Sequence, residues 1–334
     1  DVPGYATLVQ KNTLESLDDY ITDAGINLAD FNGITDQVTV DGSLYELPFR
    51  SDYWLIYYNK DVFDAAGIAY PSNDMTMEDY DALARQLTDT TYGSQVYGCH
   101  YHTWRSAVEL FGILDGKHSI LDGNYDWMIP YYDMILSEED DGVCQTYTDL
   151  STEGLHYSAA FSNGNVAMMN MGSWFISTLI SNLDSGEYDS SLCGNWGIAS
   201  YPHPDGAEAG STIATITGLA VTSASANKDA AFDFVNWVSG TEGAKVMAST
   251  GNFPAIMTDD VINTIAGMAG FPTDESSKEA LNITNAYLEV PYAENVSEIN
   301  SILDTYHTSI MNREVTVEEG VASMNEQVGK ILNQ

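Results

Sequence analysis

Apolar residues return every three or four positions in separate segments of the chain, which is the spacing of one face of an α-helix. One such segment begins at Thr76, where Asp79 completes a capping box with Asp in place of the usual Glu or Gln. A last one begins at Thr316 with Glu319 as its capping partner. The segments between them are marked by Trp104, Ala107, Val108 and Phe111, by Ala231, Phe234, Val235 and Val238, and by Ile299, Ile302, Leu303, Tyr306 and Ile310.

Short apolar runs of strand length lie between these helical segments. They cover residues 44–48, 53–58, 165–170, 196–200 and 218–222. Because strands and helices alternate, the sequence predicts an α/β fold in which each lobe holds a largely parallel sheet flanked by helices. A length of 334 residues exceeds what one ordinary core supports, so two lobes are expected.

Acidic residues dominate the charge of the chain. The 49 Asp and Glu residues against 11 Lys and Arg residues give a net charge of −38. Phosphate groups are recognised by clusters of Lys and Arg, so nucleic acid is not expected as a partner, and an anionic membrane surface would repel the chain. No stretch approaches the roughly 20 consecutive apolar residues of a membrane-spanning helix.

The three cysteines, Cys99, Cys144 and Cys193, are widely spaced and form no CxxC pair. Neither a disulfide framework nor a zinc site is predicted, and buried thiols are the default, with one disulfide left open for an exported protein. His100 and His102 lie next to Cys99, but no second cluster at ligand spacing accompanies them. The sequence therefore predicts no metal and no cofactor.

The most specific motif is LYELPF (residues 44–49) followed by SDYWLIYYNKDVF (residues 51–63). It resembles the sugar-binding subunits of ABC importers, the relatives of maltose-binding protein. Further matches follow in family order: AFSNGNVAM (160–168), GSW (172–174), ITGLAV (216–221), NKDAAFDFV (227–235) and GNFPA (251–255). This resemblance covers essentially the whole chain and implies a two-lobed fold of the periplasmic-binding-protein type II class, with a hinge between the lobes.

The same resemblance implies how the chain is divided. Lobe one is expected to hold residues 1–60 and 217–289, and lobe two residues 61–216 and 290–334. Family members open with a strand, a helix and a second strand before the part that resembles residues 5–20, so this β-α-β unit is expected to be missing from lobe one. The implied partners are a carbohydrate and the permease subunits of an ABC transporter. A monomer is expected, in the periplasm or lipid-anchored at the cell surface.

A pocket for a neutral sugar combines polar side chains with aromatic faces, because the ligand offers hydroxyl groups and flat C–H patches. Arg50, Asp52 and Trp54 are expected in a loop between two strands, where Asp52 can accept hydrogen bonds from two hydroxyls. The alternative for Arg50 and Asp52 is a surface ion pair. Trp174 follows a predicted strand at a strand-to-helix corner, where open α/β folds bind ligands, although a core position is also open to it.

Four further residues are nominated by the resemblance. Tyr101 and Trp104 match positions at which the family often places aromatic rings against sugar, although the apolar stripe favours a core position for Trp104. Gly218 and Phe253 are nominated chiefly because they lie in matching motifs.

No nucleophile elbow, Walker A loop, GxGxxG turn or HExxH helix occurs in the sequence. Together with the resemblance, this absence predicts capture of a sugar without catalysis. One alternative is a glycoside hydrolase that uses two carboxylates. Another is a binding protein that serves adhesion or signalling, which the sequence does not separate from import.

Overall fold

Helices and strands alternate along the chain in the computed structural model, which describes residues 2–31, 33–89 and 95–333. The strands are β1 (Leu47–Asn59), β2 (Tyr97–His100), β3 (Val166–Gly172), β4 (Trp196–Ser200), β5 (Thr212–Leu219) and β6 (Ala286–Leu288). The α-helices are α1 (Val2–Gln10), α2 (Asp18–Ala24), α3 (Lys60–Ala66), α4 (Met77–Leu87), α5 (Ser106–Ile113), α6 (Ile129–Asp140), α7 (Tyr147–Glu153), α8 (Tyr157–Ser162), α9 (Trp174–Ser185), α10 (Ser190–Cys193), α11 (Lys228–Ser239), α12 (Thr241–Ala248), α13 (Asp259–Ala266), α14 (Glu275–Glu279), α15 (Val296–Met311) and α16 (Val317–Leu332). Short 3-10 helices cover Leu28–Phe31, Thr35–Val38 and Asp126–Met128.

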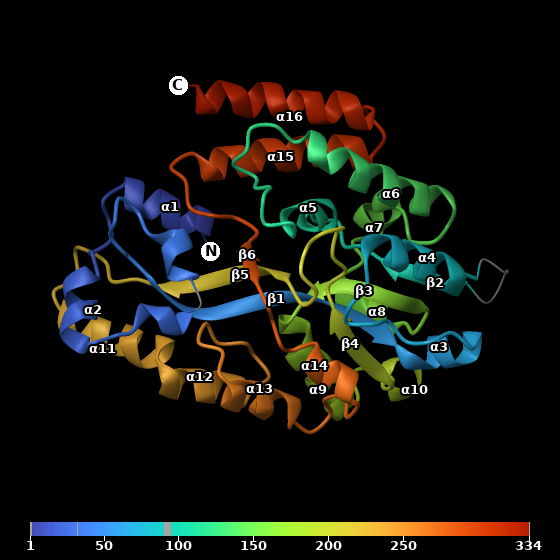
Figure 1. The fold of residues 1–334 in the computed structure, drawn as a ribbon, viewed down its shortest axis with the longest axis horizontal. Coiled ribbons are helices and arrows are strands. Elements are labelled where there is room, and N and C mark those ends of the chain that lie inside the picture. Colours follow the sequence, from blue (N-terminus) through green and yellow to red (C-terminus); the bar gives the residue numbers. More distant parts are fainter. Residues whose placement is uncertain (1, 32, 90–94, 334) are drawn as a thin grey trace.

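Strand β1 is the centre of the sheet and runs across the middle of the molecule (Figure 1). The strand order is β2-β3-β1-β5-β6, and β4 also pairs with β1. Along residues 47–53 the partner of β1 is β5, and along residues 54–59 its partners are β3 and β4. The hydrogen-bond partners of β1 therefore change between Tyr53 and Trp54.

The predicted α/β fold is confirmed, but the sheet is mixed rather than largely parallel. Among the described strands, β1 is antiparallel to β3, β4 and β5, and only the pairs β2–β3 and β5–β6 are parallel. The difference arises because one long strand passes through both parts of the sheet and meets three partners that run against it. Apolar runs in the sequence carry no information on strand direction, so the prediction could not register this.

Two local predictions about strands were wrong. The segment Arg50–Trp54 was expected to be a loop, yet it lies inside β1, where Ser51 and Asp52 are buried. Polar residues have low strand propensity, but the sheet partners of this segment override that preference. The strand expected at residues 218–222 also begins earlier, because β5 starts at Thr212 and ends at Leu219.

The predicted helices are confirmed at α4, α11, α15 and α16. Both capping boxes form, with reciprocal hydrogen bonds between Thr76 and Asp79 and between Thr316 and Glu319. Helices α15 and α16 pack against each other along one side of the molecule, the top of Figure 1. The short helices α1 and α2 near residue 1 were not predicted.

Buried apolar side chains form one continuous cluster that extends through both ends of β1. Every side chain from Tyr53 to Tyr58 is buried, which fits a strand covered on both faces. The lobe boundaries at residues 60, 216 and 289 stay a prediction. No helix among the described residues has the length and apolar character needed to cross a membrane.

A close contact between β2 and α4 gives a first test of the packing. A Cβ atom added at Gly98 would lie 1.8 Å from the carbonyl oxygen of Ala84, so the backbone must move to admit it. We expect Gly98→Ala to lower the free energy of unfolding in urea by about 1–3 kcal/mol, as overpacking does. Gly329→Ala in α16 is the matched control, because nothing lies within 4 Å of its added methyl group.

The control variant should be unchanged or more stable by up to about 1 kcal/mol, because alanine favours a helix over glycine. Equal stability of Gly98→Ala and the wild type would contradict the close approach of β2 to α4.

Candidate functional site

Three tryptophan rings gather where β1 changes partners. Trp54 belongs to β1, Trp174 is the first residue of α9, and Trp104 lies just before α5. The ring centroids of Trp54 and Trp174 are 5.5 Å apart, those of Trp54 and Trp104 6.4 Å, and those of Trp104 and Trp174 6.2 Å. Trp54 is buried, Trp174 is half-buried and Trp104 is 41% exposed. We call these three residues the tryptophan cluster.

The corner between β3 and α9 is tied to β1 by hydrogen bonds of Ser173. Its backbone N–H donates to the carbonyl oxygen of Tyr53 at 2.8 Å, and its hydroxyl accepts from the backbone N–H of Tyr53 at 3.2 Å. Gly172 completes the corner, because a Cβ atom there would lie 2.0 Å from the ring of Trp174. The predicted strand-to-helix corner is confirmed, and glycine is what lets the ring of Trp174 fold over the end of the strand.

Arg50 and Asp52 lie on the same face of β1 as Trp54, because side chains alternate along a strand. The Nε atom of Arg50 is 2.7 Å from Oδ2 of Asp52, and the hydroxyl of Ser173 donates to Oδ1 of Asp52 at 3.0 Å. Burial raises the pKa of Asp52, while Arg50 and Ser173 act in the opposite direction. The ion pair anticipated for these residues exists, but Asp52 is buried rather than on the surface.

Three aromatic residues beside the cluster were not nominated from the sequence. The ring centroid of Trp104 is 4.6 Å from that of His102 and 5.7 Å from that of Tyr157, and His156 and Tyr157 lie 3.9 Å apart. Burial, followed by the charge of His156, lowers the pKa of His102 to about 4, so this ring is neutral at pH 7. The available signal was the pair of rings at residues 156–157, just before the AFSNGNVAM motif.

Some polar atoms in and beside the tryptophan cluster have no partner within the protein. Among the described residues, Trp54 Nε1, His102 Nδ1 and Asn170 Oδ1 are buried without a hydrogen bond. Trp54, His102 and Asn170 line one small hollow together with Trp104. Buried polar groups are rarely left unpaired, so these three atoms mark a place where the packing leaves hydrogen-bonding capacity unused.

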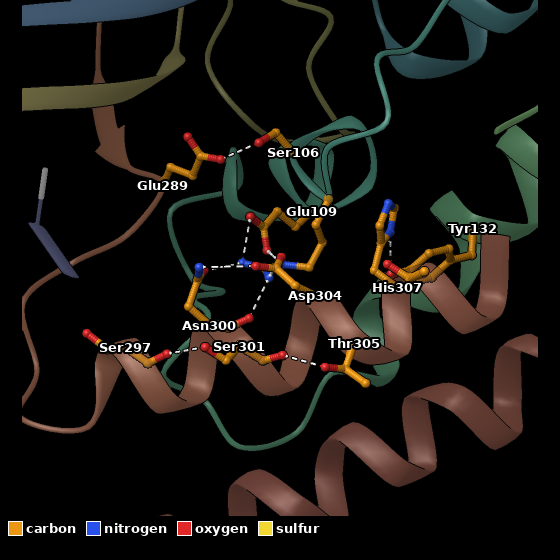
Figure 2. Close-up of polar contacts among 12 residues, drawn as sticks. Ser106, Glu109, Tyr132, Glu289, Ser297, Asn300, Ser301, Asp304, Thr305 and His307 are labelled. Carbon is orange, nitrogen blue, oxygen red and sulfur yellow. Dashed lines mark hydrogen bonds and ion pairs between the residues drawn. The ribbon is translucent and has the colours of Figure 1, made fainter. Parts of the chain in front are cut away.

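The residue after Trp104, Arg105, is the centre of an ionic network in which Arg105 and Glu109 are buried and Asp304 is exposed. The Nε atom of Arg105 donates to Glu109 at 2.6 Å, and its terminal nitrogens donate to the carbonyl oxygen of Asn300 at 3.1 Å and its side-chain oxygen at 2.6 Å. Asp304 is also paired with Arg105. Figure 2 shows Glu109, Asn300 and Asp304 turned toward one another where α5 meets α15. The network fixes the start of α5 and with it the position of Trp104.

Glu289, which follows β6, joins three segments that are distant in the sequence. One of its carboxylate oxygens accepts from the hydroxyl of Ser106 at the start of α5, and the other accepts from Thr215 of β5 at 2.9 Å. Figure 2 shows the contact between Glu289 and Ser106. Residues 215 and 289 lie at two of the three expected lobe boundaries, which fall at residues 60, 216 and 289, so this carboxylate lies where the hinge is predicted.

Three of the eight nominated residues lie apart from both the tryptophan cluster and the pair of Arg50 and Asp52. Tyr101 is buried against Tyr80 and Phe111, with both ring distances at 6.4 Å. Phe253 is fully buried against Tyr53. Gly218 faces a carboxylate: a Cβ atom there would lie 2.4 Å from the side chain of Glu46, which explains the glycine by packing. The roles proposed for these residues in binding stay predictions.

A separate cavity of about 550 Å³ lies beside Tyr53, whose side chain is on the face of β1 opposite Asp52 and Trp54. Its wall is made by Met257, Asp259, Ile262 and residues 281–287. None of the eight nominated residues lines it. Its aromatic side chains are Tyr53 and Tyr287, whereas the three rings of the tryptophan cluster lie beside the pair of Arg50 and Asp52.

Comparison with solved structures shows the class of protein to which this fold belongs. A crystal structure of a sugar transporter from Rhizobium etli, in an open conformation, matches with 47% sequence identity and a TM-score of 0.91, over 98% of this chain and 83% of that chain. The fold is that of a two-lobed solute-binding protein. The model of the bacterial extracellular solute-binding protein family also matches residues 1–245. The chain belongs to this family.

More distant structures share the fold. An ABC substrate-binding protein from Listeria monocytogenes, in complex with cycloalternan, is 21% identical with a TM-score of 0.79 and matches over 98% of this chain and 82% of its own. A solute-binding protein of an ABC transporter from Agrobacterium vitis, with bound D-mannitol, is 15% identical with a TM-score of 0.68, over 99% and 83% of the two chains. The search of curated proteins found no match.

The buried carboxyl group of Glu46 gives a test that depends on pH. Burial raises the pKa of Glu46 from 4.5 to about 7. Between these values the folded state keeps a proton that the unfolded state has released, so this group lowers stability as pH rises. We expect Glu46→Gln to exceed the wild type in free energy of unfolding by about 2–3 kcal/mol at pH 8 and to equal it near pH 4. A difference that does not vary between pH 4 and pH 8 would contradict this assignment.

Proposed function

We propose that the protein captures a carbohydrate at the tryptophan cluster and delivers it to the permease subunits of an ABC importer. The observation that carries this proposal is the cluster itself, formed by Trp54, Trp104 and Trp174 beside the paired side chains of Arg50 and Asp52. The sugar transporter from Rhizobium etli, at 47% identity, supports the same class of ligand.

The chemistry of the cluster matches a neutral sugar. Trp104 and Trp174 have exposed ring surface against which the C–H face of a pyranose ring packs. Asp52 accepts hydrogen bonds from sugar hydroxyls, and the guanidinium of Arg50 donates to them. Rings supply most of the contact area, and the polar groups select the hydroxyl pattern.

Binding is proposed to close the two lobes around the sugar. The sugar contacts the two lobes together, so it binds the closed state more tightly than the open one and shifts the equilibrium toward closure. The hinge is proposed to lie at the crossing segments, which include β1, β5 and the residues near Glu289. Arg50 then acts for lobe one and Trp104 and Trp174 for lobe two, with Trp54 between them on β1.

We further propose that the protein is a monomer without catalytic activity that acts outside the cytoplasmic membrane, in the periplasm or anchored by lipid. Asp52 is paired with Arg50 and Ser173 rather than with a second carboxylate, which is not the arrangement a glycoside hydrolase requires. The match to an extracellular family supports the location.

The first experiment is a thermal-shift screen against mono- and oligosaccharides. A sugar that binds only the native state raises the melting temperature, and the rise grows with sugar concentration. Calorimetry on each positive sugar then gives its affinity, and chromatography of the mixture shows whether the sugar is recovered unchanged. Recovery of cleaved sugar would overturn the proposal of capture without catalysis.

Trp174 gives the sharpest variant for this site. We expect Trp174→Ala to weaken binding of the identified sugar by roughly 1–3 kcal/mol, as the loss of a buried aromatic contact does. Trp237→Ala is the matched control, because Trp237 is 53% exposed on α11 and belongs to no part of the cluster. Calorimetry of both variants makes the comparison. Wild-type affinity in Trp174→Ala would place the sugar elsewhere.

A further inference from the structure

Cys99 and Cys144 come together although they are far apart in the sequence. Cys99 belongs to β2, and Cys144 lies between α6 and α7. The backbone N–H of Cys99 donates to the carbonyl oxygen of Val143 at 3.4 Å, so the two segments run side by side. The Sγ atoms lie within 4.8 Å of each other. A disulfide requires two cysteines that are close neighbours in space, and these two segments bring Cys99 and Cys144 together.

The third cysteine is not part of this group. Cys193 lies at the end of α10, where its thiol donates to the carbonyl oxygen of Asp189 at 3.7 Å. All three cysteines are buried. Any bond between Cys99 and Cys144 therefore leaves Cys193 as a thiol.

We infer that Cys99 and Cys144 form a disulfide in the exported protein. The family to which the chain belongs is extracellular, and compartments outside the cytoplasm are oxidising. In the reaction two S–H bonds break and one S–S bond forms, releasing two protons and two electrons. A disulfide of an oxidising thiol–disulfide exchange partner accepts both electrons and is reduced to two thiols.

Glu138 is the third member of this buried group and raises the question of a metal ion. Both of its carboxylate oxygens lack a hydrogen bond among the described residues. A closed structural zinc site takes four protein ligands, whereas this group offers two sulfur atoms and one carboxylate among the described residues. A disulfide carries no charge, so burial does not oppose it, and it is the better occupant.

The disulfide is placed where it supports the candidate site. Cys99 immediately precedes the segment from His100 to Trp104, which carries two rings of the candidate site from β2 to α5. The disulfide links the N-terminal end of this segment, at Cys99, to the loop between α6 and α7. Because both sulfur atoms are buried, thiolate reductants in solution reach the bond only when the protein opens.

The test counts thiols after refolding in a glutathione redox buffer. The wild type, unfolded without reductant and treated with a thiol reagent, should show one reactive thiol, which is the three cysteines less the bonded pair. Cys193→Ser should show none. Cys99→Ser and Cys144→Ser should each show two, and mass spectrometry of a digest should find residues 99 and 144 in one cross-linked peptide.

Two further measurements distinguish the disulfide from two unbonded thiols. Dithiothreitol should reduce the bond at least about tenfold more slowly in the native protein than in denaturant, because of its burial. Cys99→Ser should melt about 5–10 °C below Cys193→Ser, since it lacks the cross-link. Three reactive thiols in the refolded wild type would overturn the inference, as would a bond to Cys193 or a bound metal ion accompanied by three thiols.

Discussion

The change of hydrogen-bond partners along β1 is the constraint on which the rest of the structure depends. One continuous strand is bonded to β5 in its first half and to β3 and β4 in its second half. The alternation of side chains then places Arg50, Asp52 and Trp54 on one face at this junction. The corner at Ser173, bonded to Tyr53, brings Trp174 to the same place. The geometry of the site therefore follows from the sheet.

Two of the few basic residues of the chain lie at this junction. The chain has only 11 basic residues against 49 acidic ones, and two of the basic residues lie at the candidate site. Arg50 pairs with Asp52, and Arg105 joins Glu109, Asn300 and Asp304 behind Trp104. A buried ion pair gains little net stability but holds its members in a fixed geometry when its hydrogen bonds are satisfied. The two arginines position groups of the site more than they stabilise the fold.

The sequence predicted the helices well and the sheet less well. Period and capping residues located α4, α15 and α16, because those signals are local. The direction of β1 relative to its partners depends on contacts between distant residues, and no local signal records it. The same reason explains the candidate site: Trp54, Trp104 and Trp174 were nominated one by one, and only the fold shows that they are neighbours. His102 and Tyr157 were missed because an aromatic residue near the start of a helix can belong to the hydrophobic core as readily as to a binding site.

A crystal structure of the protein with the sugar that gives the largest thermal shift tests the central claim most directly. The account predicts a sugar ring packed against Trp174, with a hydroxyl group within hydrogen-bond distance of Asp52. The sugar should also touch Trp104, which is 41% exposed in the unliganded chain. A sugar bound instead in the cavity beside Tyr53, with the tryptophan cluster unoccupied, would contradict it.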